Sequence, residues 1–331
     1  MIGYYVHHHG VGHMTRADSI SRALEEPVTV LSSRPRPAEH GSTDWIGLPM
    51  DTDPAPPVDP TAGSVVHWAP IGVVGLTDRM AAIAAWIERT SPRLVVVDVS
   101  VEVTVFIRLM GVPVVVMAMP GFRGDDVHSL AYRMASHIVA PWSRDVYDPD
   151  WLRPFADKTT YTGSISRFDG RDRDVCDEPP TVLVLGAAGG TSLTEEILAG
   201  WADPRYSTRA VGFGGAGWVD DVWPLLCSAE VVLTHAGQNA VADVAAAGVP
   251  AVIVPQQRPF GEQIATGHAL ATARIAAVTT TWPTADEWTP ILDRASALGR
   301  DRWAALQTAG AATRAARAIA AAADASSSVA R

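Results

Sequence analysis

The sequence predicts an α/β protein made of two doubly wound, Rossmann-like domains that face a cleft. Short β-branched runs alternate with longer Ala- and Leu-rich stretches over most of the 331 residues. Several of these runs, including LVVVD at 94–98 and VPAVIVP at 249–255, are continuously apolar. Strands covered by helices on both faces have this composition, which indicates parallel sheets. The alternation stops at a charged segment that ends in Pro-Pro at 179–180 and then restarts, which indicates a second domain.

Ten strands are expected, five on each side of that break. The first five cover 2–8, 28–32, 94–98, 112–118 and 137–140. The second five cover 181–185, 208–212, 230–234, 250–255 and 275–279. Helix-length stretches between them indicate right-handed βαβ units. We therefore expect a first domain over 1–165, a linker over 166–180, a second domain over 181–310, and a C-terminal helix and tail over 311–331.

The composition excludes several classes of protein. Hydrophobic residues make up 47% of the chain, which is too many for a disordered protein. The net charge of −10 disfavours nucleic acid as a partner, because phosphate binding needs a basic surface. Two cysteines, Cys176 and Cys227, exclude a disulfide scaffold and have no zinc-type spacing. We see no signal peptide and no apolar run of about 18 residues, so a cytoplasmic protein is expected, with peripheral membrane contact left open.

The first candidate site is the segment HHHGVGHMTR at 7–16, where a strand passes into a helix. Gly10 and Gly12 allow a positive φ and a close approach of the backbone. A helix N-terminus beside such a turn favours an anion, and His13 at the helix start has the chemistry of a general base. The alternative is a tight turn with incidental histidines. Adjacent strand residues point to opposite faces, so the three consecutive histidines are not expected to converge on a metal ion.

The second candidate is LVLGAAGGTSL at 183–193, which repeats the strand, glycine turn and helix pattern. Gly186, Gly189 and Gly190 would let backbone amides approach a diphosphate. The segment lacks the Gly-Lys-Ser/Thr ending of a nucleoside-triphosphate loop. Plain packing of a strand against a helix is the alternative.

The third candidate is the most informative, and it runs over 233–263. A strand ends at Thr234, a turn follows, and a helix is expected over 238–247 with Gly248 as its C-cap. The N-terminus of this helix can hold a phosphate, with His235 as a nearby donor. Asp243 lies about one turn deeper and shares a helix face with Asn239, so its two oxygens could accept the hydroxyls of a ribose.

Three further features of this half have two interpretations each. Glu262 and Gln263 could hydrogen-bond sugar hydroxyls, or Glu262 could simply favour a helix start, and Asp243 could be a solvated helix residue. Trp218 opens a loop that could hold a base by backbone contacts, or it could pack over the next helix as a hydrophobic staple. In the first half, Asp98 ends a strand at the cleft and could orient a base, or it could cap the following helix.

On these motifs, residues 218–263 resemble the donor-binding region of nucleotide-sugar glycosyltransferases of the GT-B fold. The similarity is to the family-28-like group that includes the lipid II-forming N-acetylglucosaminyltransferases. The GVGHMTR turn resembles the N-terminal glycine loop of that group, and also a loop of a related UDP-sugar hydrolase. Three positions depart from the group's pattern: Asp243 replaces Glu, Glu262 replaces Gln or Asp, and Ala188 replaces Ser.

The resemblance implies a role for each candidate residue. Val219 would present its backbone to uracil, and Asp243 would contact the ribose. Glu262 and Gln263 would hold the donor sugar, while His13 would be the base and Asp98 would orient it or contact the acceptor. The diphosphate would lie among His235, the amides of Gly237, Gln238 and Asn239, and the glycines Gly10, Gly12, Gly186, Gly189 and Gly190.

The resemblance also implies inverting transfer of a sugar from a nucleotide donor, expected to be a UDP-sugar, to an acceptor hydroxyl. No cofactor and no metal are expected, because helix N-termini would neutralise the leaving group and no DxD-type pair ends a strand. Two alternatives remain: a nucleotide-sugar hydrolase that uses water, and a non-catalytic sugar-nucleotide or glycan-binding protein. The acceptor and the oligomeric state are not readable, although the segments 49–63 and 117–134 could form an apolar acceptor site.

Overall fold

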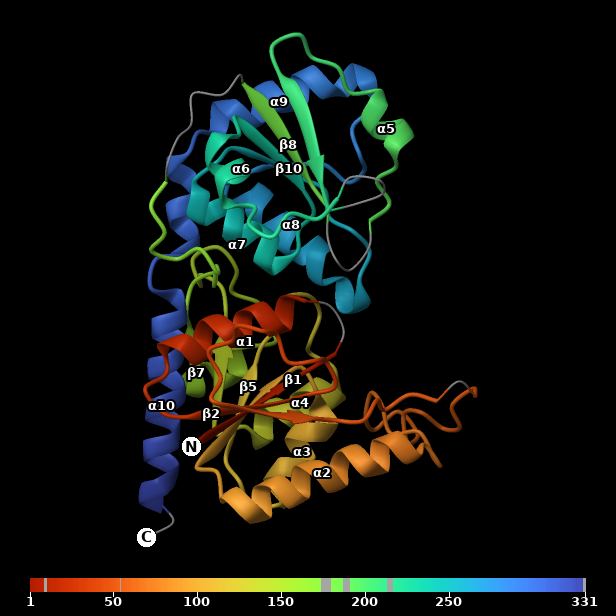
Figure 1. Cartoon of the computed structure of the whole chain (residues 1–331), viewed down its shortest axis with the longest axis vertical. Helices are drawn as coiled ribbons and strands as arrows, with labels where there is room; N and C mark the ends of the chain where they lie inside the picture. Colours follow the sequence, from red (N-terminus) through yellow and green to blue (C-terminus); the bar gives the residue numbers. More distant parts are fainter. Residues whose placement is uncertain (9–10, 54, 174–179, 187–190, 213–216, 330–331) are drawn as a thin grey trace.

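The computed structural model describes all residues except 9–10, 54, 174–179, 187–190, 213–216 and 330–331. The described residues form two parallel sheets with helices on their faces, stacked as an upper and a lower domain in Figure 1. The predicted α/β class with two doubly wound domains is therefore confirmed.

The first sheet has seven described strands in the order β3-β2-β1-β4-β5-β6-β7, and every neighbouring pair is parallel. All five strands expected in this half are present, and β3 and β7 were not expected. The bounds are β1 Ile2–Val6, β2 Val28–Ser32, β3 Asp44–Gly47, β4 Leu94–Asp98, β5 Val114–Met117, β6 His137–Ala140 and β7 Thr159–Tyr161.

Helices cover both faces of this sheet because its strands are apolar on both faces. Tyr5, Val95 and Val97 pack against α2 (Val74–Thr90), α3 (Val101–Leu109) and α4 (Asp126–Met134). Their sequence neighbours Tyr4 and Val96 point the other way, against α1 (Gly12–Ala23) and the C-terminal helix α10 (Ala311–Val329). A 3₁₀ helix, η1 (Arg153–Lys158), precedes β7.

The second sheet has five described strands, all parallel, in the order β12-β11-β10-β8-β9. Its strands are β8 Thr181–Leu185, β9 Ser207–Val211, β10 Val231–Thr234, β11 Ala251–Ile253 and β12 Ala277–Val278. Its helices are α5 Glu195–Ala199, α6 Trp223–Ser228, α7 Gln238–Ala247, η2 Pro259–Gly261, α8 Glu262–Thr272, α9 Ala285–Leu298 and η3 Asp301–Leu306.

The chain passes between the two domains twice. Ile165 belongs to the core of the first domain, and Phe168 belongs to the core of the second. After η3, the chain returns and α10 lies along the first domain, where Ala315 and Ile319 are buried against the sheet and α1 (Figure 1). The C-terminal helix is therefore part of the first domain's core.

The carboxyl ends of the two sheets meet at the boundary between the domains. The Asn239 side-chain amide donates to the carbonyl oxygen of Gly12 at 3.1 Å. The amide of Phe122 donates to the carbonyl oxygen of Phe260 at 2.9 Å. Open parallel sheets bind ligands at this end, so the boundary is where a site is expected. In the described part of the chain, no helix combines the length and the apolar character needed to cross a membrane.

Candidate active site

The end of β4 and the start of α1 bring His13, Arg16 and Asp98 together. His13 Nδ1 lies 2.8 Å from Asp98 Oδ1. Arg16 donates to both carboxylate oxygens, from Nε at 2.9 Å and from Nη2 at 2.6 Å. Ser100, not Asp98, caps α3 by accepting from the amide of Val103, so the alternative of Asp98 as a helix cap is wrong.

Asp98 is an ionised carboxylate although it is 0% exposed. Burial on its own would raise the pKa of this carboxyl, but the charges and hydrogen bonds of Arg16 and His13 hold the pKa well below its usual range. The hydroxyl of Tyr4 also donates to Oδ2, at 3.4 Å. The carboxylate therefore accepts the proton that the His13 ring carries on Nδ1.

His13 is oriented for proton transfer by this contact. When Nδ1 donates to Asp98, the neutral ring has its basic lone pair on Nε2. The His13 side chain is 16% exposed, and its ring lies one helical turn from Arg16. A base held in one tautomer by a buried carboxylate is the arrangement that general-base catalysis uses.

Across the domain boundary, the N-terminus of α7 forms an anion-binding arrangement. Its N-cap is Gly237, which has no side chain to accept from the first amides of the helix. His235, directly after β10, is 1% exposed, and its Nε2 has no hydrogen-bond partner among the described residues. Burial, with a smaller contribution from Arg258, lowers the pKa of His235 to about 4, so the ring is neutral at pH 7. A neutral ring with Nε2 protonated offers one unused donor beside the helix N-terminus.

The side chains of Gln238 and Asn239 contact the first domain. Gln238 Oε1 accepts from Arg16 Nη1 at 3.0 Å, and Asn239 reaches the carbonyl of Gly12. These two contacts place the N-termini of α1 and α7 next to each other. Gly12 is the first residue of α1 and has no positive φ, and a Cβ there would lie 3.6 Å from Asn239 Oδ1, an ordinary van der Waals distance, so neither feature requires a glycine at this position.

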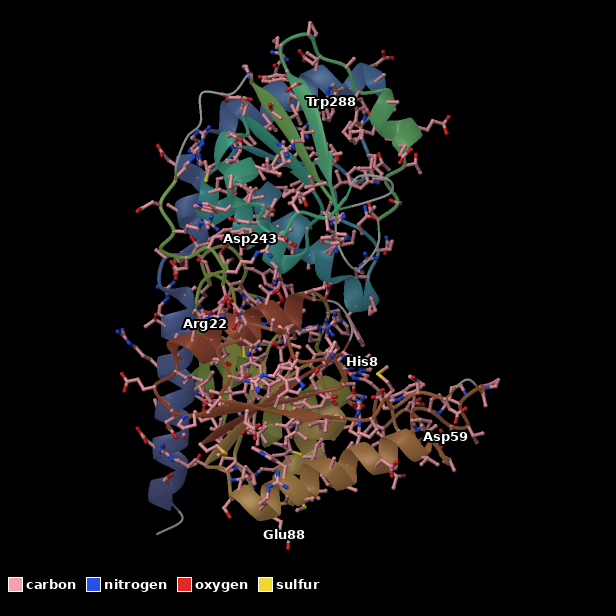
Figure 2. All side chains as sticks on the ribbon, in the orientation of Figure 1. His8, Arg22, Asp59, Glu88, Asp243 and Trp288 are labelled. Carbon is pink, nitrogen blue, oxygen red and sulfur yellow. The ribbon has the colours of Figure 1, made fainter. Side chains whose placement is uncertain are left out.

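Asp243 lies deeper in α7 and faces the chain segment that joins the domains. Its Oδ1 accepts from Ser166 Oγ at 2.8 Å, and its Oδ2 accepts from Arg167 Nε at 3.1 Å. Burial raises the pKa of Asp243, while Arg167 and Ser166 oppose that shift. The residue is buried, in the part of the second domain nearest to the first (Figure 2), so it is not the solvated helix residue of the alternative.

Glu262 and Gln263 begin α8 and point toward different partners. Gln263 is buried, and its Oε1 accepts from the amide of Gln256 at 2.9 Å. Glu262 Oε2 lies 3.7 Å from Arg123 Nη2 of the first domain, a contact that spans the domain boundary. Neither geometry tests a role in holding a sugar, which stays a prediction for both.

The glycine turn after β8 is described only at its first residue. Gly189 and Gly190 lie outside the described residues, as do Ala188 and, in the first domain, Gly10. The amide of Gly186 donates to the carbonyl of Val211 at 2.8 Å, so this amide is already engaged in the sheet.

In the loop before α6, the side chain of Trp218 points into solvent. Trp218 is 70% exposed, so the staple interpretation is wrong. Val219 packs partly buried against the second domain's core. Trp223, the first residue of α6, packs into the core instead: it is buried, and its ring centroid lies 4.9 Å from that of Phe168.

A pocket of about 550 Å³ lies in the first domain, and the ring centroid of its lining residue His7 is 6.4 Å from that of His13. It is lined by Tyr5, His7, His8, Asp51, Thr52, His67, Trp68, Leu76, Arg79, Met80, Ser100, Glu102 and Val103, and by Pro259 of the second domain. Of the two segments expected to form an acceptor site, 49–63 contributes Asp51 and Thr52. The described residues of 117–134 do not line this pocket, and Phe122 is exposed, so their part in an acceptor site stays a prediction.

Comparisons with known proteins show which families and folds the chain is similar to. The model of the glycosyltransferase family 28 C-terminal domain matches residues 213–280. A Nocardioides protein, named UDP-N-acetylglucosamine--N-acetylmuramyl-(pentapeptide) pyrophosphoryl-undecaprenol N-acetylglucosamine transferase, is 26% identical over 282 residues, which cover 76% of this chain and 75% of that protein. A protein of the same name from Rubrobacter xylanophilus is 27% identical over 173 residues, covering 45% of this chain and 49% of that protein.

Solved structures share the fold of the whole chain. MurG of Acinetobacter baumannii superimposes with a TM-score of 0.63 at 15% identity, covering 97% of this chain and 99% of that one. The glycosyltransferase of kitacinnamycin gives a TM-score of 0.65 at 16% identity, covering 97% and 98%. The chain is a glycosyltransferase of the GT-B fold, and its second domain is similar to the family 28 C-terminal domain.

In this glycosyltransferase, the residues 213–280 that match the family model contain His235, the N-terminus of α7, and the pair Glu262 and Gln263. The sequence motifs therefore lie in the segment that the family model matches, and the role of each of their residues stays a prediction. They did not single out Arg16 as a site residue, although the arginine of GVGHMTR stands three residues after His13 and so shares its helix face.

One group of side chains in the described part of the glycosyltransferase has ligand atoms close enough to surround a metal ion: His67, Asp125 and His128, within 4.8 Å of one another. Hydrogen bonds already occupy part of this group, because His128 Nδ1 lies 2.6 Å from Asp125 Oδ2 and His128 Nε2 lies 3.1 Å from Arg123 Nη1. The guanidinium charge of Arg123 opposes a cation there. The expectation of metal-independent catalysis stays a prediction.

Proposed function

We propose that this glycosyltransferase moves a sugar from a UDP-sugar to an acceptor hydroxyl in one inverting displacement, without a metal ion. One observation carries the proposal. The His13–Asp98 pair lies at the N-terminus of α1, which touches the N-terminus of α7, beside the unpartnered Nε2 of His235. A base and an anion-binding helix end thus face the same boundary from opposite domains.

His13 would act as the base. Its Nε2 takes the proton of the acceptor hydroxyl as the hydroxyl oxygen attacks the anomeric carbon of the donor sugar. The bond from that carbon to the diphosphate oxygen breaks, and its electron pair leaves with UDP. Because attack and departure occur on opposite faces, the anomeric configuration inverts. Asp98 stabilises the imidazolium that forms, and Arg16 keeps Asp98 ionised.

The second domain would stabilise the leaving diphosphate. Free amides in the first turn of α7 and the helix dipole favour the charge that develops there, and His235 would donate from Nε2. This neutralisation needs no metal ion and no cofactor. We assign uracil to the backbone of Val219, and the donor sugar to Glu262 and Gln263. We assign the ribose to Asp243, whose oxygens keep lone pairs beside the contacts with Ser166 and Arg167.

The pocket beside His13 supports transfer over hydrolysis. Water as an acceptor needs no binding site, whereas a space of about 550 Å³ suits a small organic molecule. His7 lines this pocket, and its ring centroid lies 6.4 Å from that of His13. We therefore assign the pocket to the acceptor. A cytoplasmic location and peripheral membrane contact stay predictions.

Calorimetry with UDP, dTDP, GDP and NAD tests the donor assignment. We expect UDP to bind with the highest affinity, and His235→Asn to weaken it by about tenfold, as loss of one charge-assisted hydrogen bond does. A matched control is His268→Asn, an exposed histidine of α8. Equal binding of all four nucleotides, or none, would refute the proposal. Turnover of the bound UDP-sugar with and without an acceptor mixture then separates transferase from hydrolase.

A further inference from the structure

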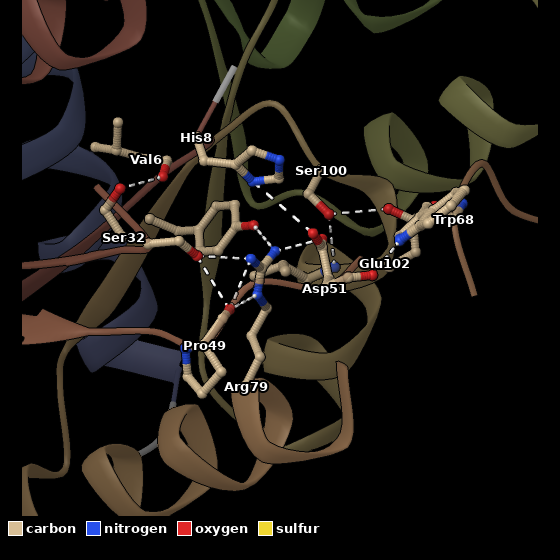
Figure 3. Close-up of polar contacts among 12 residues, drawn as sticks. Val6, His8, Ser32, Pro49, Asp51, Trp68, Arg79, Ser100 and Glu102 are labelled. Carbon is tan, nitrogen blue, oxygen red and sulfur yellow. Dashed lines mark hydrogen bonds and ion pairs between the residues drawn. The ribbon is translucent and has the colours of Figure 1, made fainter. Parts of the chain in front are cut away.

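The acceptor pocket is lined by apolar side chains around a polar floor. Trp68, Leu76, Met80 and Val103 supply apolar surface, and the floor is formed where the segment after β3 meets α2 and the start of α3 (Figure 3). Pockets of this kind bind an organic body through their walls and fix its orientation through a few polar groups. Which acceptors fit therefore depends on the charge of those polar groups and on whether each already has a hydrogen-bond partner within the protein.

The one permanent cation among the described lining residues is already paired. Arg79 is buried, and its Nη1 donates to Asp51 Oδ2 and to the hydroxyl of Tyr5 (Figure 3). Its Nη2 donates to Ser33 Oγ at 2.6 Å, and Nε and Nη2 both donate to the carbonyl of Pro49. Every nitrogen of the guanidinium thus has a protein acceptor, so Arg79 is not set up to receive an anionic ligand.

Glu102 is also satisfied within the protein. Its Oε1 accepts from the backbone amides of His67 at 2.7 Å and Trp68 at 2.9 Å, and its Oε2 accepts from the hydroxyl of Ser100 at 2.9 Å. These contacts anchor the chain at Trp68 to the start of α3. Glu102 therefore shapes the pocket and adds a negative charge to it.

Asp51 differs from both, because one of its oxygens is unsatisfied. Asp51 is 6% exposed, and Oδ1 accepts no hydrogen bond from any described residue. His8 Nδ1 lies 3.9 Å from Oδ1, beyond hydrogen-bond distance (Figure 3). A buried carboxylate oxygen without a donor is costly, so a ligand that supplies a donor gains that free energy on binding.

The charges of the pocket favour a cationic donor. Two carboxylates, Asp51 and Glu102, line it against one paired guanidinium, together with His7, His8 and His67. Two carboxylates against one guanidinium give the permanent charges of the lining a negative sum, and this repels a phosphate or carboxylate. The acceptor named for the two bacterial relatives carries a pyrophosphoryl group, which this lining disfavours.

We propose that the pocket selects a compact hydroxyl compound that carries a protonated amine, with the ammonium group donating to Asp51 Oδ1 and the hydroxyl directed to His13. The inference rests on the proposed function, because it takes the pocket as the acceptor site. To the proposed function it adds that the acceptor is positively charged and that Asp51 recognises this charge.

Three phenols of similar size test this selectivity. Tyramine, para-ethylphenol and phloretate share one hydroxyl-bearing ring and end in a cation, a methyl group and an anion. Calorimetry first confirms that UDP binds, and the three probes are then titrated into the UDP complex. We expect tyramine to bind at least about tenfold more tightly than para-ethylphenol, and phloretate to bind most weakly.

Two variants locate the selectivity. Asp51→Asn keeps the shape of the side chain and should reduce the preference for tyramine to about threefold or less, with UDP affinity unchanged. Asp53→Asn is the matched control, since it removes one exposed acid of the same loop and should change nothing. Leu76→Trp fills the pocket without touching Asp51 or Arg79, and should abolish binding of all three probes even if Asp51→Asn folds poorly.

The outcomes separate this inference from the proposed function. Phloretate binding as tightly as tyramine, an unchanged preference in Asp51→Asn, or UDP binding with no phenol binding would each overturn the inference and leave the donor assignment standing. Absence of UDP binding would overturn the proposed function and the inference with it.

Discussion

The orientation of the His13 ring depends on its contact with Asp98, and the charge of Asp98 depends on Arg16. The carboxylate is fully buried, and without the guanidinium it would take up a proton or pay a large desolvation cost. Arg16 also reaches Gln238 of the second domain at 3.0 Å. The same side chain therefore keeps Asp98 ionised beside the proposed base and connects this pair to the helix that would hold the leaving group.

His13→Gln tests the base directly. Glutamine can donate to Asp98 but cannot take a proton, so kcat should fall by about 100-fold to 10,000-fold while the Kd of UDP stays within about twofold. Steady-state kinetics with calorimetry of UDP measures both. Thr15→Gln, at a half-buried position of the same turn of α1, is the control; a kcat for His13→Gln within about fivefold of the wild type would contradict the role.

His235 predicts a pH dependence of stability. Burial lowers its pKa to about 4 in the folded protein, against about 6.5 in an unfolded chain. As pH falls from about 6.5 to about 4, the unfolded chain gains a proton that the folded protein does not bind, so the free energy of unfolding decreases. Urea denaturation at pH 7 and pH 5 should show a smaller decrease for His235→Asn than for the wild type. His128, whose pKa is also lowered to about 4, maintains part of the decrease in both proteins; equal decreases would contradict the assignment.

The second-domain motif predicted where β10 ends and where α7 begins, whereas the sequence predicted only one segment of the pocket, 49–63. His235 and the start of α7 follow from a strand that ends at Thr234 and a helix that ends at Gly248. Asp51 and Arg79 come from separate segments that only the folded sheet brings together. The contacts of Gln238 and Asn239 with the first domain depend on how the domains dock, which no local pattern encodes.

At the scale of elements, buried strands were predictable and edge strands were not. The continuous apolar runs of β4 and β10 gave their positions because both faces are covered. The two missed strands, β3 and β7, lie at the edges of the first sheet and are half-exposed, so their composition lacks an apolar run. Helix α7 has the predicted bounds, and Gly248 ends it in the left-handed conformation at φ 63°.

The start of α2 requires a glycine. A Cβ at Gly75 would overlap the carbonyl oxygen of Met50, next to Asp51 of the pocket. Gly75→Ala should therefore lower the free energy of unfolding by about 1–3 kcal/mol and disturb the pocket floor. Gly47→Ala is the matched control, because none of the described atoms would lie within 4 Å of its Cβ. Urea midpoints measure both variants, and equal stabilities would contradict the packing described for α2.

At the scale of the whole molecule, α10 ties the end of the chain to the first domain. The sequence predicted the helix from its composition but not its partner, because an Ala-rich face fits many surfaces. The structure places Ala315 and Ile319 against α1 and the first sheet. The C-terminal helix thus completes the core of the first domain, although it follows the second domain in the sequence.

A charge in the α10 interface should therefore destabilise the protein. Ala315→Glu buries a carboxylate without a partner and should lower the free energy of unfolding by about 3 kcal/mol or more. Thr313→Glu introduces the same side chain at an exposed position of the same helix and should change it by less than about 0.5 kcal/mol. Thermal unfolding measures the melting temperatures of the two variants. Equal melting temperatures would show that α10 is not part of the core.

The central claim is that a base in the first domain and an anion-binding helix in the second domain act together in sugar transfer. The most direct test is the rate of UDP release from a UDP-sugar by the wild type and by His13→Gln, each with and without a saturating hydroxyl acceptor. The account predicts that release by the wild type requires the acceptor and falls by about 100-fold or more in His13→Gln. Release at the same rate without acceptor, or release that does not depend on His13, would contradict it.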